Sequence, residues 1–164
     1  MKRIVALVVA LSAVFSGIAA PRAEEQTVQN IVGTWTLVSA TIQASDVKID
    51  LFGPDPSGRL MFGGDGRYTL IFLRRDLPKL ASNVRQSQTA DESRSITKGS
   101  IAHFGTYRVD EAGKFIVFRI EGSTFPNWTG AEQRRPFSLA GDELTYISPG
   151  STGVATQVVV RRAK

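Results

Sequence analysis

The sequence predicts an all-β domain built as a single antiparallel up-and-down barrel of about eight strands. Short segments rich in β-branched and aromatic residues alternate with turns containing Gly, Pro and Asp. Most of these turns are short, which favours strands that pair with their neighbours in sequence. The chain has no cysteine, so burial of a core must hold the fold together. A two-sheet sandwich is the alternative, but Greek-key folds need longer crossovers than most of these turns supply.

Residues 1–23 have the features of a secretory signal peptide. Lys2 and Arg3 form a basic start, and a mainly apolar run over residues 4–15 is followed by small residues. This run is too short to span a membrane, which takes roughly 20 residues. We therefore expect a secreted protein, located in the bacterial periplasm, with no stable membrane anchor.

Cleavage is expected near Ala19 or Ala23, and residues 24–164 are expected to form one barrel domain. Cleavage after Ala23 removes three basic residues, so 20 − 3 = 17 basic residues face 15 acidic ones. The resulting charge of +2 is no reason to expect nucleic acid as a partner. With one histidine and no cysteine in the chain, we expect neither a metal ion nor another cofactor.

The first predicted strands cover residues 33–42, 59–62 and 67–74. The last two flank Gly-Gly-Asp-Gly at 63–66, a strong hairpin signal. The strand over 67–74 is apolar on both faces, whereas a sheet with one solvated face would alternate apolar and polar residues. We expect a barrel whose outer face is also covered; a subunit interface is the alternative.

A polar segment over residues 75–99 is the one interruption in this regular pattern. Thr89 followed by Glu92 has the spacing of a capping box, which predicts a short helix around 90–97. Beyond it the strands resume, with a hairpin turn predicted at 110–113. The remaining predicted strands are 101–109, 114–121, 132–139, 143–148 and 154–162.

A series of motifs runs along the chain: Gly33-Thr34-Trp35, Gly53 to Arg59, Gly64 to Tyr68, Thr89 to Glu92, Phe104 to Val109, Phe125 to Gly130, Gln133, Arg135, and Leu139 to Leu144. In this order the motifs resemble the bacterial and fungal lipocalin-like domain family, over residues 30–162. The resemblance implies a calycin-type barrel, but it does not imply a defined activity. Where the family pattern has histidines, in the strand before the aromatic loop, this chain reads Val117-Phe118-Arg119, so no activity that depends on those histidines is carried over.

Four residues are structural signatures under this resemblance. It implies that Trp35 closes one barrel end beneath an arginine of the last strand, in a cation–π contact. Arg162 is the better candidate, because it shares a face with the apolar residues of that strand whereas Arg161 faces the other way. Pro126 and Gly130 favour the turns of the aromatic loop.

Arg135 is the leading candidate for a ligand contact. It shares a strand face with Phe137, so the guanidinium points inward if that ring does. A buried cation is costly unless it is paired or offered an anion. An inward arginine beside a tyrosine hydroxyl suits a carboxylate, because the guanidinium binds it through two hydrogen bonds. By the same alternation, Tyr107, Tyr146 and Arg119 are candidate companions.

Two other roles remain open for Arg135 at this point. It could form a structural salt bridge with Glu132 or Glu121 that ties the loop to the barrel. It could also lie on a solvated face.

His103, the only histidine, lies on the predicted strand face of Ile101, Tyr107 and Val109. It is the natural acid–base candidate, although a lone histidine on an apolar strand face is more often a satisfied core or rim residue. The sequence contains no Ser-His-Asp spacing, phosphate loop or paired carboxylates. We therefore assign no catalytic residue.

These observations predict an exported barrel that binds a small hydrophobic or amphipathic molecule. One alternative is an isomerase, cyclase or hydratase acting in the same cavity, which would need His103, Tyr107 or Glu121 inside. The other is a barrel filled by its own side chains that serves as an interaction module. The oligomeric state is not predicted. The candidate ligand-binding residues are Arg135, Tyr107, Trp128, Phe118, Phe137, Tyr146, Phe72 and His103, with Trp128 at the cavity mouth.

Overall fold

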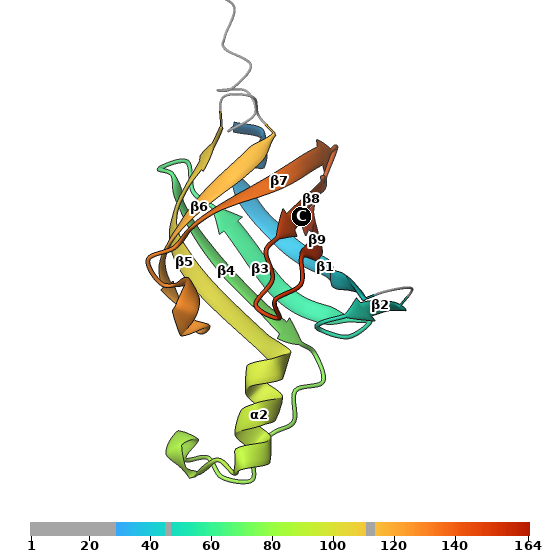
Figure 1. Ribbon diagram of the computed structural model, residues 1–164, viewed down its shortest axis with the longest axis vertical. Helices are drawn as coiled ribbons and strands as arrows, with labels where there is room; N and C mark the ends of the chain where they lie inside the picture. Colours follow the sequence, from blue (N-terminus) through green and yellow to red (C-terminus); the bar gives the residue numbers. More distant parts are fainter. Residues whose placement is uncertain (1–28, 45–46, 111–113) are drawn as a thin grey trace, which may run out of the picture.

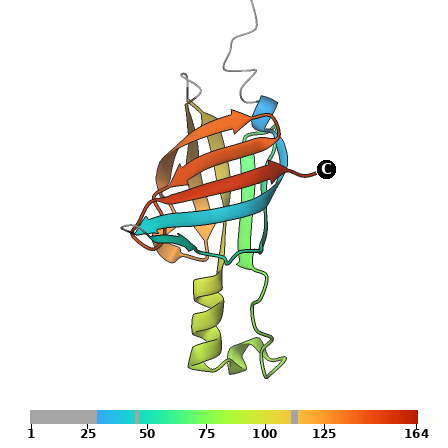
Figure 2. The ribbon, with the colours of Figure 1, turned by 90° about the vertical axis from the view of Figure 1, so that its right-hand side faces the viewer.

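The computed structural model describes residues 29–44, 47–110 and 114–164. The predicted signal peptide and most of the predicted turn at 110–113 lie outside these residues. The described chain forms one antiparallel sheet, with a helix projecting from it (Figures 1 and 2). Its strands are β1 (Gly33–Ala44), β2 (Val47–Asp50), β3 (Pro56–Phe62), β4 (Arg67–Arg74), β5 (Ser100–Val109), β6 (Phe115–Ser123), β7 (Glu132–Ala140), β8 (Glu143–Ser148) and β9 (Thr156–Arg162).

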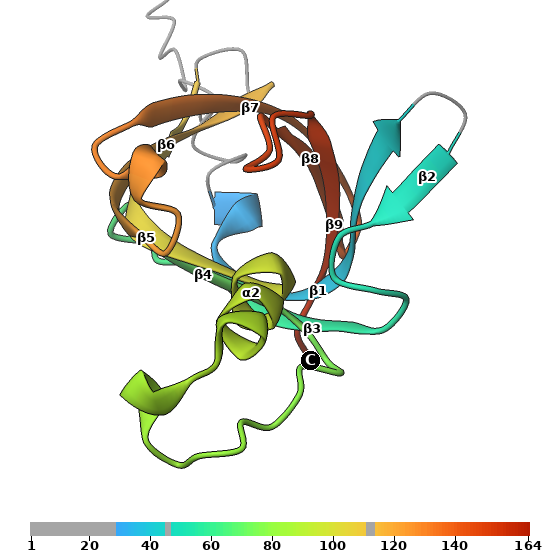
Figure 3. The same cartoon turned by 60° about the horizontal axis from the view of Figure 1, so that its bottom comes forward.

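Pairing of the first strand with the last closes the sheet. The strand order is β2-β1-β3-β4-β5-β6-β7-β8-β9, and β1 also pairs with β9, which leaves β2 outside a ring of eight strands (Figure 3). The predicted up-and-down barrel is therefore confirmed. The sequence did not predict β2, a strand of only four residues whose side chains are all exposed, including those of Val47 and Ile49.

Period-two alternation places one face of each strand inside. In β4, Tyr68, Leu70 and Phe72 are buried and contribute to the core. The residues between them face outward, and Ile71 is 42% exposed. The prediction that the outer face would be covered is wrong for this strand, because no neighbouring element lies over it within the described chain.

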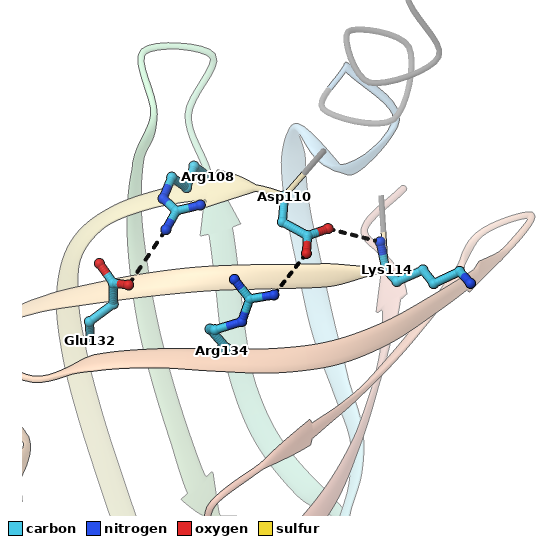
Figure 4. A network of polar contacts seen from close by, with 5 residues as sticks. All are labelled: Arg108, Asp110, Lys114, Glu132 and Arg134. Carbon is cyan, nitrogen blue, oxygen red and sulfur yellow. Dashed lines mark hydrogen bonds and ion pairs between the residues drawn. The ribbon is translucent and has the colours of Figure 1, made fainter. Parts of the chain in front are cut away.

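The outer face of β6 is covered by long charged side chains. Val117 is buried and lies in register with Arg108 of β5 and Arg134 of β7. Arg134 pairs with Asp110 at 2.9 Å, and Arg108 approaches Glu132 at 3.5 Å (Figure 4). The methylene stems of these arginines shield apolar surface while their charged groups stay in water. Val117 is buried on the outer face of β6 for this reason.

Trp35 and Arg162 close one end of the barrel, as predicted. The guanidinium carbon of Arg162 lies 4.3 Å from the centroid of a Trp35 ring, and its Nη1 donates to the Val32 carbonyl at 3.0 Å. Trp35 Nε1 in turn donates to the carbonyl oxygen of Ile31, in a helical turn at 29–31, at 2.8 Å. Arg161 points outward and pairs with Glu143. We call this the closed end.

The helix α2 (Ala90–Gly99) projects from the opposite end, which we call the open end (Figures 1 and 3). Its N-terminus has the predicted capping box: Glu92 N–H donates to the Thr89 hydroxyl, and the Glu92 carboxylate accepts from Thr89 N–H. The helix confirms the predicted interruption and ends two residues later than predicted, at Gly99. The open end also carries the 3-10 turn η2 (Pro126–Trp128) and the loop between β8 and β9.

Candidate functional site

A narrow cavity lies inside the barrel at the open end. The centre of a water molecule can reach about 40 Å³ of it, whereas all empty space between the lining atoms is about 370 Å³. The smaller figure is the one that compares with cavity volumes, since the larger one includes open solvent at the mouth. By that measure one water needs roughly 10–15 Å³, so the cavity holds only a few waters. The lining residues are Ala40, Leu51, Phe52, Leu70, Phe72, Ile101, His103, Trp128, Arg135, Tyr146, Ser148, Gly150, Ser151, Thr156 and Val158.

Arg135 supplies a positive charge at this cavity. It is 1% exposed, and its Nε and Nη2 both donate to the side-chain oxygen of Gln133, at 3.1 and 2.7 Å. The guanidinium carbon lies 4.4 Å from the ring centroid of Phe118. Burial lowers the pKa of Arg135, but an arginine starts so far above neutrality that it keeps its charge.

The predicted salt bridge of Arg135 is wrong. Glu132 lies on the outer face of β7 and interacts with Arg108, and Glu121 is exposed. Within the described part of the chain, Arg135 has no ion pair. Its well-formed hydrogen bonds go to the neutral amide oxygen of Gln133, and the other side chain that interacts with it closely, Tyr146, is a neutral phenol. The charge is therefore buried without a counter-ion.

Tyr146 of β8 brings a hydroxyl to the same place. The residue is 1% exposed, and its hydroxyl is buried without a hydrogen bond of acceptable geometry. The Arg135 guanidinium carbon is 5.5 Å from the Tyr146 ring centroid. Burial raises the pKa of Tyr146 to about 12, although the nearby arginine opposes the shift. The phenol therefore stays protonated at neutral pH and can donate a hydrogen bond.

His103 and Tyr68 form a second polar pair beside the cavity. The Tyr68 hydroxyl lies 3.0 Å from His103 Nδ1, and His103 is 3% exposed. Burial, followed by the positive charge of Arg135, lowers the pKa of His103 to about 3. The imidazole is therefore neutral near pH 7. It can accept or donate a hydrogen bond in the cavity but adds no second charge.

The aromatic loop after β6 places Trp128 at the cavity mouth. Pro126 begins the turn η2, and Gly130 has a φ of +82°, a backbone conformation that glycine adopts readily. The Trp128 ring is 5.7 Å from the His103 ring, measured between centroids. Phe125 packs edge-on against Trp128 at 5.6 Å. The loop thus covers part of the opening with two rings.

The structure brings together five of the predicted ligand-binding residues and separates three. Phe72, His103, Trp128, Arg135 and Tyr146 line the cavity. Phe118 packs against the Arg135 guanidinium but does not line the cavity, and Phe137 is half-buried at the edge of the core. Tyr107 donates a hydrogen bond to the Gly63 carbonyl at the closed end. The proposed companion Arg119 is exposed.

Sequence reasoning missed Gln133 and Tyr68. Gln133 lies two residues before Arg135 on the same strand face, so the alternation that placed the arginine inside could also have placed its acceptor. Tyr68 shares a strand face with Phe72, but the sequence alone did not indicate its contact with His103.

The described residues contain no group of three or more His, Cys, Asp or Glu side chains that could hold a metal ion. No helix among them has both the length and the apolar character needed to cross a membrane.

Comparison with protein families decides which family this barrel represents. A family model described as a lipocalin-like domain matches residues 32–160. The chain belongs to the lipocalin-like domain family. A comparison with curated proteins gave no match. A lipocalin-like barrel suggests a binding function in general, because barrels of about eight strands can enclose one small ligand.

Proposed function

We propose that this lipocalin-like protein binds a small amphipathic molecule in the cavity at its open end. The observation that supports this most strongly is that the cavity combines apolar walls with polar groups that lack partners. The walls include Leu70, Phe72 and Val158. Arg135 has no counter-ion, and the Tyr146 hydroxyl has no well-formed hydrogen bond. An amphipathic molecule would satisfy both parts, since ligand sites combine apolar walls with a few oriented polar groups.

A neutral fluorescent probe tests the cavity directly. N-phenyl-1-naphthylamine should bind to the purified protein with increased emission, and amphipathic competitors should displace it. Ala40→Leu should weaken probe binding at least fivefold, because Ala40 lines a cavity with little enclosed space. Ala102→Leu is the matched control: its neighbours Ile101 and His103 line the cavity, so Ala102 faces outward. Equal loss in both variants, or no probe binding at all, would contradict the proposal.

Native mass spectrometry of protein isolated from its own host would identify a natural ligand. We expect a co-purifying molecule that dissociates on denaturation. A consistently empty wild-type barrel, together with no displacement of the probe by any amphiphile, would count against binding.

We propose further that the protein is exported to the periplasm, on the basis of residues 1–23. Expression in a Gram-negative bacterium, followed by fractionation and intact-mass measurement, tests this. The periplasmic fraction should contain a chain shortened by residues 1–19 or 1–23. A full-length chain retained in the cytoplasm would refute export without affecting the binding proposal.

The catalytic alternative has less support than binding. His103 does line the cavity, but a base with a pKa of about 3 is poorly matched to proton transfer near neutral pH. Tyr107 is engaged with a backbone carbonyl, and Glu121 is exposed. The filled-barrel alternative fits the closed half, where Trp35 and Phe62 occupy the interior, but it leaves the cavity unexplained.

A further inference from the structure

We propose that the ligand is an organic acid that enters with its carboxylate first and binds it between Arg135 and the Tyr146 hydroxyl. This inference rests on the proposed binding function and adds the chemical class and the orientation of the ligand. The polar pair lies on adjacent strands, β7 and β8, and both side chains line the cavity.

The hydrogen bonds of Arg135 leave donors for a ligand. A guanidinium carries five N–H groups, and two of them point to the single oxygen of Gln133. Gln133 therefore orients the guanidinium without neutralising it. The aromatic rings around it attract the cation, with Phe118 at 4.4 Å and Trp128 at 5.6 Å, but they accept no conventional hydrogen bond. An anion would supply both a charge and acceptors.

The Tyr146 hydroxyl is a second donor without a partner. A buried polar group of this kind costs free energy unless something satisfies it. A carboxylate has two oxygens and only accepts hydrogen bonds, so it can take one from the phenol while it pairs with Arg135. A neutral alcohol would satisfy the phenol but leave the charge of the guanidinium uncompensated.

The rest of the cavity favours an acid with an unbranched apolar chain. Beyond the polar pair, the walls include Leu70, Phe72 and Val158, and little enclosed space remains. A wider groove lies directly outside, since Leu51 and Ile101 line both spaces. The carboxylate and first carbons would occupy the cavity, and the remainder of the chain would lie in the groove.

The opposite orientation is the rival. The outer groove contains Arg85 and Lys98, which could bind a carboxylate near solvent. Both are exposed, so salt would screen their attraction. The buried charge of Arg135 is screened much less. Salt dependence therefore distinguishes the two orientations without any substitution.

Octanoate and 1-octanol form a matched pair of probes, because they share a chain and differ in the head group. We expect octanoate to displace N-phenyl-1-naphthylamine at least tenfold more effectively than 1-octanol, since hydrogen bonds to charged groups are the stronger ones. Its affinity should change less than threefold between 0.05 and 0.5 M NaCl. Equal affinities, or an octanoate affinity that falls more than tenfold with salt, would overturn the proposal.

Substitutions then assign the head-group site. Arg135→Gln should weaken octanoate binding about tenfold to a hundredfold and leave 1-octanol within threefold. Arg134→Gln is the control on the outer face of the same strand and should change neither. Tyr146→Phe should weaken octanoate several-fold, and it keeps the proposal testable if Arg135→Gln does not fold. Unchanged octanoate binding in both cavity variants would refute the head-first orientation.

The outcome also separates the two proposals. If 1-octanol and the neutral probe bind but octanoate has no advantage, the carboxylate inference fails and the binding function stands. If no amphiphile and no probe binds, the binding function itself fails.

Discussion

Replacing His103 with glutamine should make the stability of the protein less dependent on pH. His103 is buried between Tyr68 of β4 and Arg135 of β7, and its pKa in the folded protein is about 3 against an ordinary value of 6.5. Between these values the unfolded chain binds a proton that the folded chain does not. The stabilising effect of the neutral imidazole is thus fully present above about pH 6.5 and is lost as the pH falls toward 3.

The size of the effect follows from this shift in pKa. Each unit of pH between the two values costs about 1.4 kcal/mol, so the contribution of His103 falls by about 2 kcal/mol from pH 7 to pH 5. Glutamine can still hydrogen-bond to Tyr68 but does not titrate. Urea unfolding followed by circular dichroism at both pH values measures the difference. Carboxylates titrate equally in both proteins, so curves that decline in parallel would refute the assigned pKa.

Three further predictions concern stability and use the same urea assay. Arg162→Gln should lower the free energy of unfolding by about 2–4 kcal/mol, because it removes the cation–π contact with the buried Trp35 ring and the hydrogen bonds to backbone carbonyls. Arg161→Gln on the outer face should lower it by less than about 0.5 kcal/mol. Equal losses in the two variants would contradict the role of Arg162 in closing this end of the barrel. Gly105→Ala should lower the free energy of unfolding by at least about 2 kcal/mol, because the added Cβ would lie 2.1 Å from a carbonyl oxygen of β6. Gly64→Ala should change it little, because a Cβ there meets no atom within 4 Å. A larger loss in Gly64→Ala than in Gly105→Ala would refute the close approach of β5 to β6. Tyr146→Phe should be neutral or stabilising without ligand, because the lost hydroxyl has no partner; a loss above about 1 kcal/mol would show that it has one.

Most of the barrel was predictable because its strands have strong local signals. Residues 67–74 are rich in aromatic and β-branched residues and follow a glycine-rich turn, so that strand was predicted with the bounds it has in the structure. The strand Val47–Asp50 alternates apolar and polar residues, but it is only four residues long and all of them are exposed. It is held in place by pairing with the end of β1, from Thr41 to Ala44. Extended structure imposed by a neighbouring strand leaves little trace in local sequence.

The sequence predicts which side chains of the candidate site point into the barrel, but not how far along the barrel axis each of them lies. Alternation placed both Tyr107 and Tyr146 inside, yet only Tyr146 reaches Arg135. Depth depends on strand register, and β5 changes register between Phe104 and Gly105. A bulge of this kind depends on the partner strand as well as on local sequence.

The wrong salt bridge has a simpler cause. Glu132 is three residues from Arg135, an odd number, so the two side chains face opposite sides of β7. Glu121, the other candidate partner, lies on the outer face of β6 and is exposed.

Closure of one end by Trp35 and Arg162 makes the interior a blind pocket with a single route in and out. Whatever occupies it must arrive and leave through the open end, which the Phe125–Trp128 loop partly covers. Substitutions of loop residues that do not line the cavity, as Trp128 does, should therefore change association and dissociation rates by the same factor and leave affinity nearly constant. Substitutions of interior residues such as Arg135 should act mainly on dissociation. Residence time in this barrel can thus be adjusted independently of selectivity, because different residues control each.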